Sequence, residues 1–516
     1  MYRGWGENML SEVRSFGVAG CDGYPVRIEA DVYQGLPAFS VVGLPDASVM
    51  EARDRVRAAM KQAGFSFPVG RVVLNLAPAD RKKSGPLYDL PIFIALLKAV
   101  GGLSAETDGC AFVGELSLSG GIRPVRGLLP MALCAKEQGV TSLFVPLENA
   151  QELRLVEGLS IYPAGHVNEV LAHLKGERPL DALVPDKSRL LPGSFPVDFS
   201  EVRGQQAAKR ALEIAAAGGH HILMIGPPGA GKSMLAARIP TILPPMDEQE
   251  VLEVTKLYSV AGLLKGGVQA VRPFRSPHHT ISAAGLAGGG AGIAAPGELS
   301  LAHRGVLFLD ELPEFGRQVT ELLRQPLETG SITLSRAGGT VTYPCRFLLA
   351  AAMNPCPCGY YGHPERACTC TDGQIAKYLH RVSGPLLDRI DLHVEVAPVH
   401  YTNLAGQEKE ESSAAIRQRV MDARERQRRR YEQDGIRLNA QLTPALQKRY
   451  CRLDGTADAV FHQAFDRLGL SARAYGRVLR VARTIADLDG AQNIGPAHIL
   501  EAVGYRDLDR KYWNKA

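Results

Sequence analysis

A glycine-rich turn that ends in lysine and serine is the stretch of this sequence best suited to chemistry. It consists of Gly226, Pro227, Pro228, Gly229, Ala230, Gly231, Lys232 and Ser233. Its glycines lack a Cβ, so backbone N–H groups can close around phosphate oxygens, and the helix expected after the turn points its positive end at them. The spacing predicts a nucleotide phosphate loop, in which Lys232 reaches the β- and γ-phosphates and Ser233 binds Mg²⁺. An apolar strand before the turn makes an ordinary glycine turn the weaker interpretation.

Two adjacent acids at the end of a second apolar run supply what such a loop needs for hydrolysis. Asp310 and Glu311 follow the apolar residues 306–309. We expect Asp310 to hold Mg²⁺, directly or through water, and Glu311 to polarise the water that attacks the γ-phosphate. Together with Lys232 they predict an ATP hydrolase that uses Mg²⁺. A pair of helix-capping acids is the alternative.

Composition bounds the rest of the chain. Its 516 residues have room for roughly three domains of about 150 residues each. Charged residues make up 22% and hydrophobic residues 45%, and the net charge of +5 permits nucleic-acid binding without arguing strongly for it. Residues 1–17 lack an apolar core, and the best apolar run, 92–100, is short and holds Lys98. We therefore expect a cytoplasmic protein with no membrane partner.

Four of the nine cysteines are clustered, which suggests a metal because cytoplasmic thiols stay reduced. Cys356 and Cys358 form one Cys-x-Cys pair, and Cys368 and Cys370 form another. The two pairs could meet as a structural zinc site. Unliganded or redox-active thiols, and a mixed site that uses His363, stay open as alternatives.

The first part of the chain reads as strands at 26–32, 38–44 and 71–76, with helices at 47–63 and 91–100. The arginines of the first helix, among them Arg55, are expected on its solvated face, with phosphate contact as the minority interpretation. Two stretches, 79–90 and 112–129, resemble the proteolytic domain of Lon-type proteases and its relative in the recombination protein RadA. The serine and lysine positions of the Lon dyad fall on Leu87 and Leu129, so the resemblance implies that fold without its chemistry.

Further motifs resemble AAA+ ATPases. A Val-x-Gly-Gln stretch implies that Val202 and Gln205 contact the base of the nucleotide. A predicted hairpin at 330–343 lifts Arg336 to its tip and precedes a buried strand that ends at Asn354, as in the branch that includes magnesium chelatases and MCM helicases. Asn354 would then be the sensor that holds the lytic water or the γ-phosphate; a turn asparagine is the alternative. We expect the glycine-rich stretch 274–290 to be a flexible inserted loop, whose His278 and His279 make loop-fixing hydrogen bonds, with metal binding as the alternative.

Two arginines match positions that ring ATPases use to sense the γ-phosphate. Arg389 sits in a Leu-x-x-Arg-hydrophobic-Asp pattern typical of an arginine finger, which reaches into the neighbouring subunit's site. An internal ion pair with Asp391 is the alternative. Arg473 matches the sensor of the C-terminal lid, with Arg477 as second choice. The arginine-rich helix expected at 416–431 is taken as a solvated basic helix, with a DNA-facing helix as the alternative.

Taken together, the order of these motifs resembles the ComM/YifB type of magnesium-chelatase-like AAA+ proteins. The resemblance implies an α/β protein in three parts: a Lon-protease-like α+β domain (1–183), an AAA+ core of the helix-2-insert and pre-sensor-hairpin type (184–400, with a cysteine-rich insertion at 354–372) and a helical lid (401–516). It implies a hexameric, ATP-driven DNA branch-migration helicase in homologous recombination and natural transformation, with branched, single- or double-stranded DNA as partner. ATP and Mg²⁺ are the expected cofactors, and Zn²⁺ is a hypothesis. A protein-remodelling or metal-insertion ATPase, like the magnesium chelatase motor or MoxR-like chaperones, is the alternative.

Overall fold

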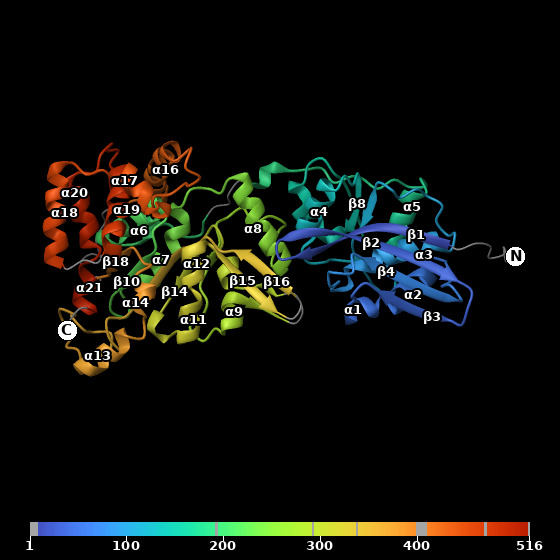
Figure 1. The fold of residues 1–516 in the computed structure, drawn as a ribbon, viewed down its shortest axis with the longest axis horizontal. Helices are drawn as coiled ribbons and strands as arrows, with labels where there is room; N and C mark the ends of the chain where they lie inside the picture. The colour runs from blue at the N-terminus through green and yellow to red at the C-terminus, as the bar shows by residue number, and fades with distance from the viewer. Residues whose placement is uncertain are drawn as a thin grey trace.

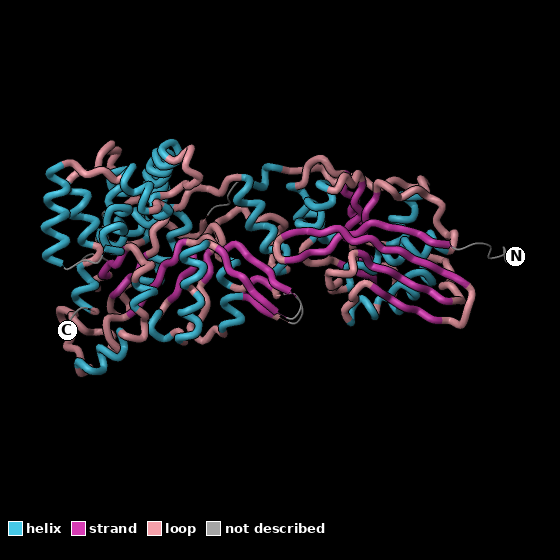
Figure 2. The backbone as a smooth tube through the Cα atoms, in the orientation of Figure 1, coloured by secondary structure: helices cyan, strands magenta, loops and turns pink. Residues whose placement is uncertain are grey.

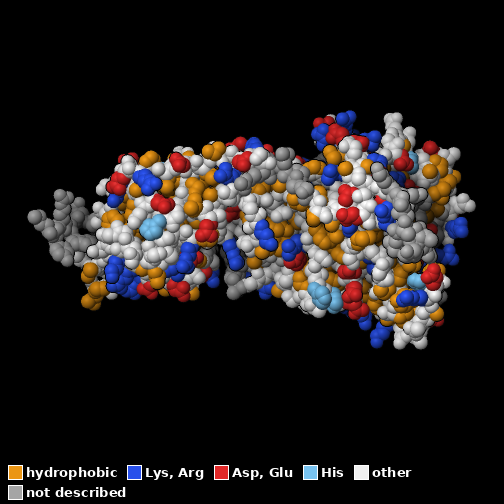
Figure 3. All heavy atoms as spheres, turned by 180° about the vertical axis from the view of Figure 1, so that it is seen from behind, with side chains coloured by type: hydrophobic (Ala, Val, Ile, Leu, Met, Phe, Trp, Pro, Cys, Tyr) orange, Lys and Arg blue, Asp and Glu red, His pale blue; other side chains and the backbone are white. Residues whose placement is uncertain are grey.

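The computed structural model describes residues 9–190, 195–290, 294–336, 339–398, 410–468 and 472–513. They form two bodies side by side, with the first 190 residues in one and the remainder in the other (Figure 1). Within these ranges, none of the helices combines the length and the apolar character that a bilayer crossing requires. On the face opposite to that of Figure 1, basic and acidic side chains are interspersed over both bodies (Figure 3).

The N-terminal body is built on a mixed seven-stranded sheet in the order β3-β4-β2-β1-β5-β8-β9. Long antiparallel strands form its centre, and the pairs at both edges are parallel. The strands are β1 (Met9–Ala19), β2 (Asp22–Tyr33), β3 (Ala38–Val42), β4 (Arg71–Ala77), β5 (Cys110–Phe112), β8 (Ser142–Pro146) and β9 (Ser160–Ala164), with β6 (Glu115–Leu116) and β7 (Ile122–Arg123) as a small separate ribbon.

Five helices complete this body: α1 (Ala47–Met50), α2 (Ala52–Gln62), α3 (Asp89–Ala99), α4 (Leu128–Glu137) and α5 (Val167–Leu174). The structure confirms the predicted strands, as β2, β3 and β4, and the predicted helix at 91–100, as α3. The helix expected at 47–63 is divided at Glu51, and the expectation that Arg55 is solvated was wrong. Its guanidinium donates to the buried carboxylate of Asp89 at 2.6 and 3.0 Å. The buried carboxylate therefore has a cationic partner, as burial of a charge requires.

The second body contains a five-stranded, all-parallel sheet in the order β11-β14-β17-β10-β18. Its strands are β10 (Ile222–Ile225), β11 (Phe274–Arg275), β14 (Val306–Leu309), β17 (Leu348–Met353) and β18 (Leu392–Glu395). They are apolar at nearly every position because helices cover both faces: Ile222 and Met224 enter one apolar core, and Leu223 and Ile225 enter the other.

Helices flank this sheet, and a hairpin extends from it toward the N-terminal body (Figure 2). The helices are α6 (Gln206–Gly218), α7 (Lys232–Ile242), α8 (Glu248–Ala261), α10 (Glu298–Leu301), α11 (Arg317–Leu322), α12 (Arg324–Thr329), α13 (Asp372–Leu379) and α14 (Gly384–Leu387); the hairpin is β15 (Ser331–Arg336) with β16 (Gly339–Pro344). The stretch expected to be a flexible glycine loop is instead partly packed. It forms α9 (Ala283–Ala287), with Leu286 buried, and a two-stranded ribbon of β12 (Gly288–Gly289) and β13 (Ala295–Pro296).

Most of the C-terminal helices pack against the α6 and α7 side of the sheet, whereas Leu508 and Tyr512 of the last helix enter the core on the other face. The C-terminal helices are α16 (Ser413–Arg430), α17 (Pro444–Tyr450), α18 (Gly455–Leu468), α19 (Ala472–Leu488), α20 (Pro496–Gly504) and α21 (Asp507–Tyr512). The interpretation of α16 as a solvated basic helix was wrong for most of its arginines. Arg424 donates to the Ala216 carbonyl, Arg419 pairs with Glu213, and Arg430 pairs with the buried Asp487. Arg419 and Arg424 therefore fasten α16 to α6, whereas Arg430 joins it to α19.

The two bodies meet where α4 packs against α8. The Gly127 N–H donates to the Ser259 carbonyl at 3.0 Å, and the Ser259 hydroxyl donates to the buried carboxylate of Glu152. Burial raises the pKa of Glu152, although hydrogen bonds from Ser259 and Asn149 oppose the rise.

Candidate functional site

The glycine-rich turn joins β10 to α7 and wraps around the amine of Lys232. Gly229 and Gly231 have φ values of +77° and +89°, a region that disfavours side chains, so the turn requires glycine at both positions. Lys232 is buried, and its Nζ donates to the carbonyls of Gly226 at 2.7 Å and Pro227 at 2.9 Å. The loop therefore holds its cation at the mouth of the helix N-terminus, where a phosphate would be received.

Burial lowers the pKa of Lys232, and the nearby charges of Asp310 and Glu311 only partly oppose this. A polyphosphate would supply the missing negative charge close to the amine. Binding of such a ligand is thus electrostatically linked to the charged form of Lys232.

The two acids directly follow β14, and Asp310 contacts the loop. Asp310 accepts a hydrogen bond from the Ser233 hydroxyl at 2.6 Å, so the two predicted magnesium ligands already face each other. Glu311 follows in the left-handed region, with φ of +53°, and its carboxylate is exposed. A non-glycine residue held in that conformation aims the side chain away from the course of the strand and is common at functional sites.

The order of the strands in the sheet places Asn354 beside Lys232. β17 lies between β10 and β14, paired in parallel with both. The carboxyl ends of three parallel strands therefore meet at one edge. The Asn354 Oδ1 accepts from the Lys232 Nζ at 3.1 Å. The loop, both acids and Asn354 line one cavity of about 380 Å³.

His279 is a residue of this site that the sequence argument missed. Its Nδ1 lies 3.5 Å from the Glu311 carboxylate, and its ring faces that of His278, with 4.1 Å between centroids. His278 instead interacts with the hydroxyl of its neighbour Thr280 at 2.9 Å. The adjacent histidines drew attention in the sequence, but only the folded loop shows which of them meets the acid.

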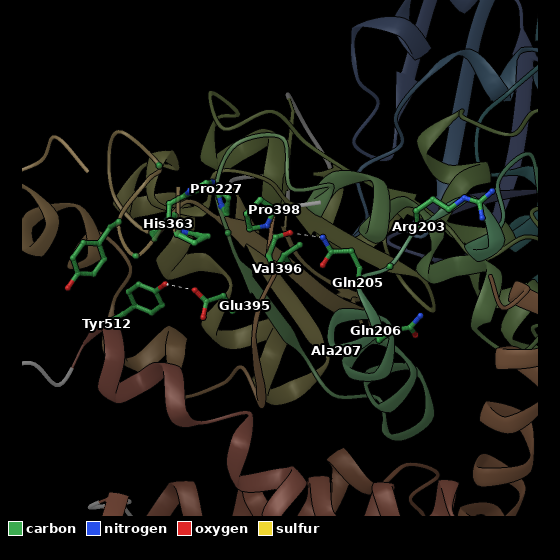
Figure 4. A pocket seen from close by; sticks show the side chains of 18 residues that line it. Arg203, Gln205, Gln206, Ala207, Pro227, His363, Glu395, Val396, Pro398 and Tyr512 are labelled. Carbon is green, nitrogen blue, oxygen red and sulfur yellow. Dashed lines mark hydrogen bonds between the residues drawn. The ribbon is translucent and has the colours of Figure 1, made fainter. Parts of the chain in front are cut away.

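A second cavity of about 410 Å³ lies beside the phosphate loop, with Gly226 and Pro227 in its lining (Figure 4). Gln205 lines it, with its Nε2 donating to the Ala397 carbonyl at 2.7 Å and the Ala230 carbonyl at 3.3 Å. Val202 is fully buried in the core and is not among the lining residues. The size of this second cavity and its position beside the phosphate loop suit the base and sugar of a nucleotide.

The four clustered cysteines come together next to this second cavity. Their sulphurs all lie within 4.8 Å of one another, and they are the one such metal-capable group among the described residues. Burial raises the pKa of Cys358, but hydrogen bonds from the backbone N–H groups of Thr369 and Tyr360 and from the Cys356 and Cys368 thiols together lower the pKa to about 5. His363 is not part of the group, and its Nδ1 accepts from the backbone N–H groups of Glu365 and Arg366. Four thiols fit a tetrahedral zinc ion.

Arg336, Arg389 and Arg477 are not among the residues that line the phosphate cavity. Arg336 is exposed at the end of β15, beside Gly289 of the glycine-rich stretch; the turn residues 337 and 338 lie outside the described part. Arg389 pairs with Glu328 of α12 and not with Asp391, whose partners are His220 at 2.8 Å and Arg480 at 3.2 Å. The side chain of Arg473 lies outside the described residues. Arg477 is buried and pairs with Asp388 at 3.0 Å.

The positions of the Lon dyad offer no nucleophile. Leu87 and Leu129 are both buried apolar side chains. Neither leucine can attack a carbonyl or accept a proton, so these positions serve packing.

Three family models match the chain. The model described as magnesium chelatase, subunit ChlI, matches residues 198–404; the model described as subunit ChlI of Mg-chelatase matches 28–149; and the model of the ChlI C-terminal part matches 410–506. The first and third cover the phosphate loop, the acids, the cysteines and the lid.

Relatives of similar length match nearly the whole chain. The uncharacterized protein YifB of Salmonella typhimurium is 45% identical over 507 residues, which are 97% of this chain and 98% of the relative. The competence protein ComM of Haemophilus influenzae is 44% identical over 492 residues, 94% of this chain and 95% of the relative. A Lon protease of Brevibacillus choshinensis is 28% identical over 103 residues only, 19% of this chain. On this similarity, the chain belongs to the ComM/YifB family of magnesium-chelatase-like AAA+ proteins.

Proposed function

We propose that this chain is an ATP-driven ring motor that acts on DNA and whose activity is the migration of DNA branch points. The observation that carries the ATPase part is the convergence of Lys232, Asn354 and the Ser233–Asp310 pair in one cavity, with Glu311 exposed at its rim. In this proposal Lys232 holds the γ-phosphate, Asp310 and Ser233 hold Mg²⁺, and Glu311 orients the attacking water.

The ring assembly is inferred from Arg389. It does not line the phosphate cavity of its own chain, and its side chain keeps partial exposure. An arginine finger acts on a site from outside, and it can add several orders of magnitude to the turnover. A hexamer in which Arg389 leaves Glu328 for the neighbour's γ-phosphate would complete each site.

DNA as the substrate is supported by two features. Arg336 projects from a hairpin beside a glycine-rich segment, an arrangement suited to contact phosphates in a central channel. The relative ComM is called a competence protein, which connects it with DNA uptake. Homologous recombination during natural transformation would be the setting for branch migration.

A second candidate is favoured by the family models, whose descriptions name a magnesium chelatase subunit. The same ATPase machinery would then remodel a protein or insert a metal. DNA would not stimulate such an enzyme.

The test compares ATP turnover with and without branched DNA for the wild type, Arg336→Ala and the control Arg27→Ala. Arg27 is a similarly charged side chain, 66% exposed on the N-terminal sheet. Stimulation by DNA in the wild type and the control, with weakened DNA binding and a salt slope lowered by about one per lost phosphate contact in Arg336→Ala, supports the proposal. ATP turnover that no DNA stimulates would favour the second candidate.

A further inference from the structure

The loop that carries the cysteines is also a wall of the second cavity. It leaves β17 at Asn354 and returns to α13 after Cys370, without a helix or strand in between. Pro355, Gly359 and residues 361–364 of this loop line the cavity, opposite Gln205. Figure 4 shows His363 near Pro227 of the phosphate loop, with Tyr512 and Glu395 below it.

The loop touches the phosphate loop directly. Gly359 has φ of +85° and approaches so closely that an added Cβ would lie 2.4 Å from the Cδ of Pro228. The residues of the loop next to this contact, Cys356 and Cys358, are two of the clustered cysteines. The position of the sulphurs therefore sets the position of the cavity wall.

The sulphur geometry suits a metal better than a disulfide. The Sγ–Sγ distances among Cys356, Cys358 and Cys368 are 3.3, 3.5 and 3.6 Å, and all four cysteines are free thiols. A tetrahedral zinc–thiolate site, with Zn–S of about 2.3 Å, spaces its sulphurs at roughly 3.8 Å. A modest adjustment would thus admit the ion, and zinc binding would release the thiol protons.

The Tyr361 ring of the loop lies near that of Tyr512, with 6.3 Å between centroids, and two further contacts are local. Arg366 donates to the Tyr360 hydroxyl at 2.8 Å, and the His363 N–H donates to the Tyr360 carbonyl at 3.0 Å. Such contacts shape the outer turn but do not tie its two ends together. The cysteine pairs stand at those ends, 356 and 358 at one and 368 and 370 at the other.

We propose that the four cysteines bind one zinc ion, and that this ion fixes residues 355–364 as a wall of the base pocket, so that loss of zinc weakens nucleotide binding. This inference rests on the proposed nucleotide-binding function. It assigns the metal a role in ligand affinity beyond the stability of the loop.

The first experiment measures metal. Zinc content is determined for the purified wild type, for Cys358→Ser with Cys370→Ser, and for the control Cys110→Ser, whose thiol lies in the N-terminal body. We expect about one zinc ion per chain in the wild type and the control, and none in the double variant. Absence of zinc from the wild type, equal zinc in the double variant, or the visible absorbance of iron would overturn the assignment.

The second experiment measures affinity for a fluorescent ADP analogue in the wild type before zinc removal by a chelator, after removal, and after zinc is added back. We expect removal to weaken binding about tenfold or more and zinc to restore it, while competition by tripolyphosphate, which lacks a base, changes much less. Tyr361→Ala should keep zinc yet bind the analogue more weakly. Thermal unfolding shows whether the stripped chain is still folded.

The outcomes separate the two proposals. Zinc that is bound but whose removal leaves the affinity of the folded chain unchanged would overturn the coupling. A wild type that holds zinc but binds no nucleotide would overturn the proposed function and the coupling with it, while the metal site would stand.

Discussion

We expect the partly buried histidine before β10 to make the parallel sheet sensitive to acid. His221 Nδ1 accepts the Leu349 N–H at 3.1 Å, and the His221 carbonyl accepts N–H groups from Asp391 and Leu392. These bonds join β10 to both neighbouring strands and so support the register that places Lys232 beside Asn354. Protonation of Nδ1 would remove the acceptor.

Burial lowers the pKa of His221 from 6.5 to about 4; the Asp391 charge opposes the shift, and His220 and Arg480 add to it. Above the unfolded pKa both states are neutral and the full stability is present. As the pH falls below 6.5, the unfolded state takes up a proton that the folded state does not, so stability is lost until the pH reaches the folded pKa. At about 1.4 kcal/mol per pKa unit, the loss at about pH 5 is at most about 2 kcal/mol, and residual exposure reduces it to about 1–2 kcal/mol.

The substitution His221→Asn tests this, because an amide oxygen can accept the same N–H without titrating. Urea unfolding of the nucleotide-free protein is followed at about pH 7.5 and about pH 5. We expect the wild type to lose about 1–2 kcal/mol more than His221→Asn between the two conditions. His462→Asn is the control, since His462 has an 80% exposed side chain. Equal acid sensitivity in His221→Asn and the wild type would refute the reasoning.

Three further predictions concern the contacts of the site and of its neighbouring segments. Arg389→Ala should reduce ATP turnover at least a hundredfold, which is a rise in activation free energy of about 3 kcal/mol or more, with little change in ADP affinity. Mixing this variant with Lys232→Ala should restore part of the turnover. A mixture as inactive as its components would contradict an arginine finger that acts between subunits. His279→Ala should raise ATP turnover in the absence of DNA several-fold, because the Glu311 carboxylate loses its contact with the imidazole. Unchanged turnover would show that this contact does not restrain Glu311. Asp391→Ala should lower the free energy of unfolding by about 3–5 kcal/mol, since His220 and Arg480 lose a buried partner; a loss below about 1 kcal/mol in urea unfolding would argue against this network.

Local sequence predicted those parts of the site that one short segment builds. The turn from Gly226 to Ser233 carries its own glycines, lysine and helix start, and Asp310 and Glu311 follow their strand directly. The approach of His279 to Glu311 was not predictable, because it depends on how a long insertion returns to the sheet.

The arginines of α16 show the opposite limit. Their number predicts a basic helix. It does not predict their partners, the carbonyl of Ala216 and the acids Glu213 and Asp487, because these belong to other helices. Likewise, the cysteine pairs suggested a metal, whereas the contact of Gly359 with Pro228 arises only from the folded loop.

Movement of a DNA strand tests the central proposal most directly. A preformed three-strand joint molecule with one labelled strand is incubated with the wild type, Lys232→Ala or Glu311→Gln, with and without ATP. We expect ATP-dependent release of the labelled strand by the wild type and its loss in both variants. ATP hydrolysis by the wild type without movement of that strand would contradict the proposal.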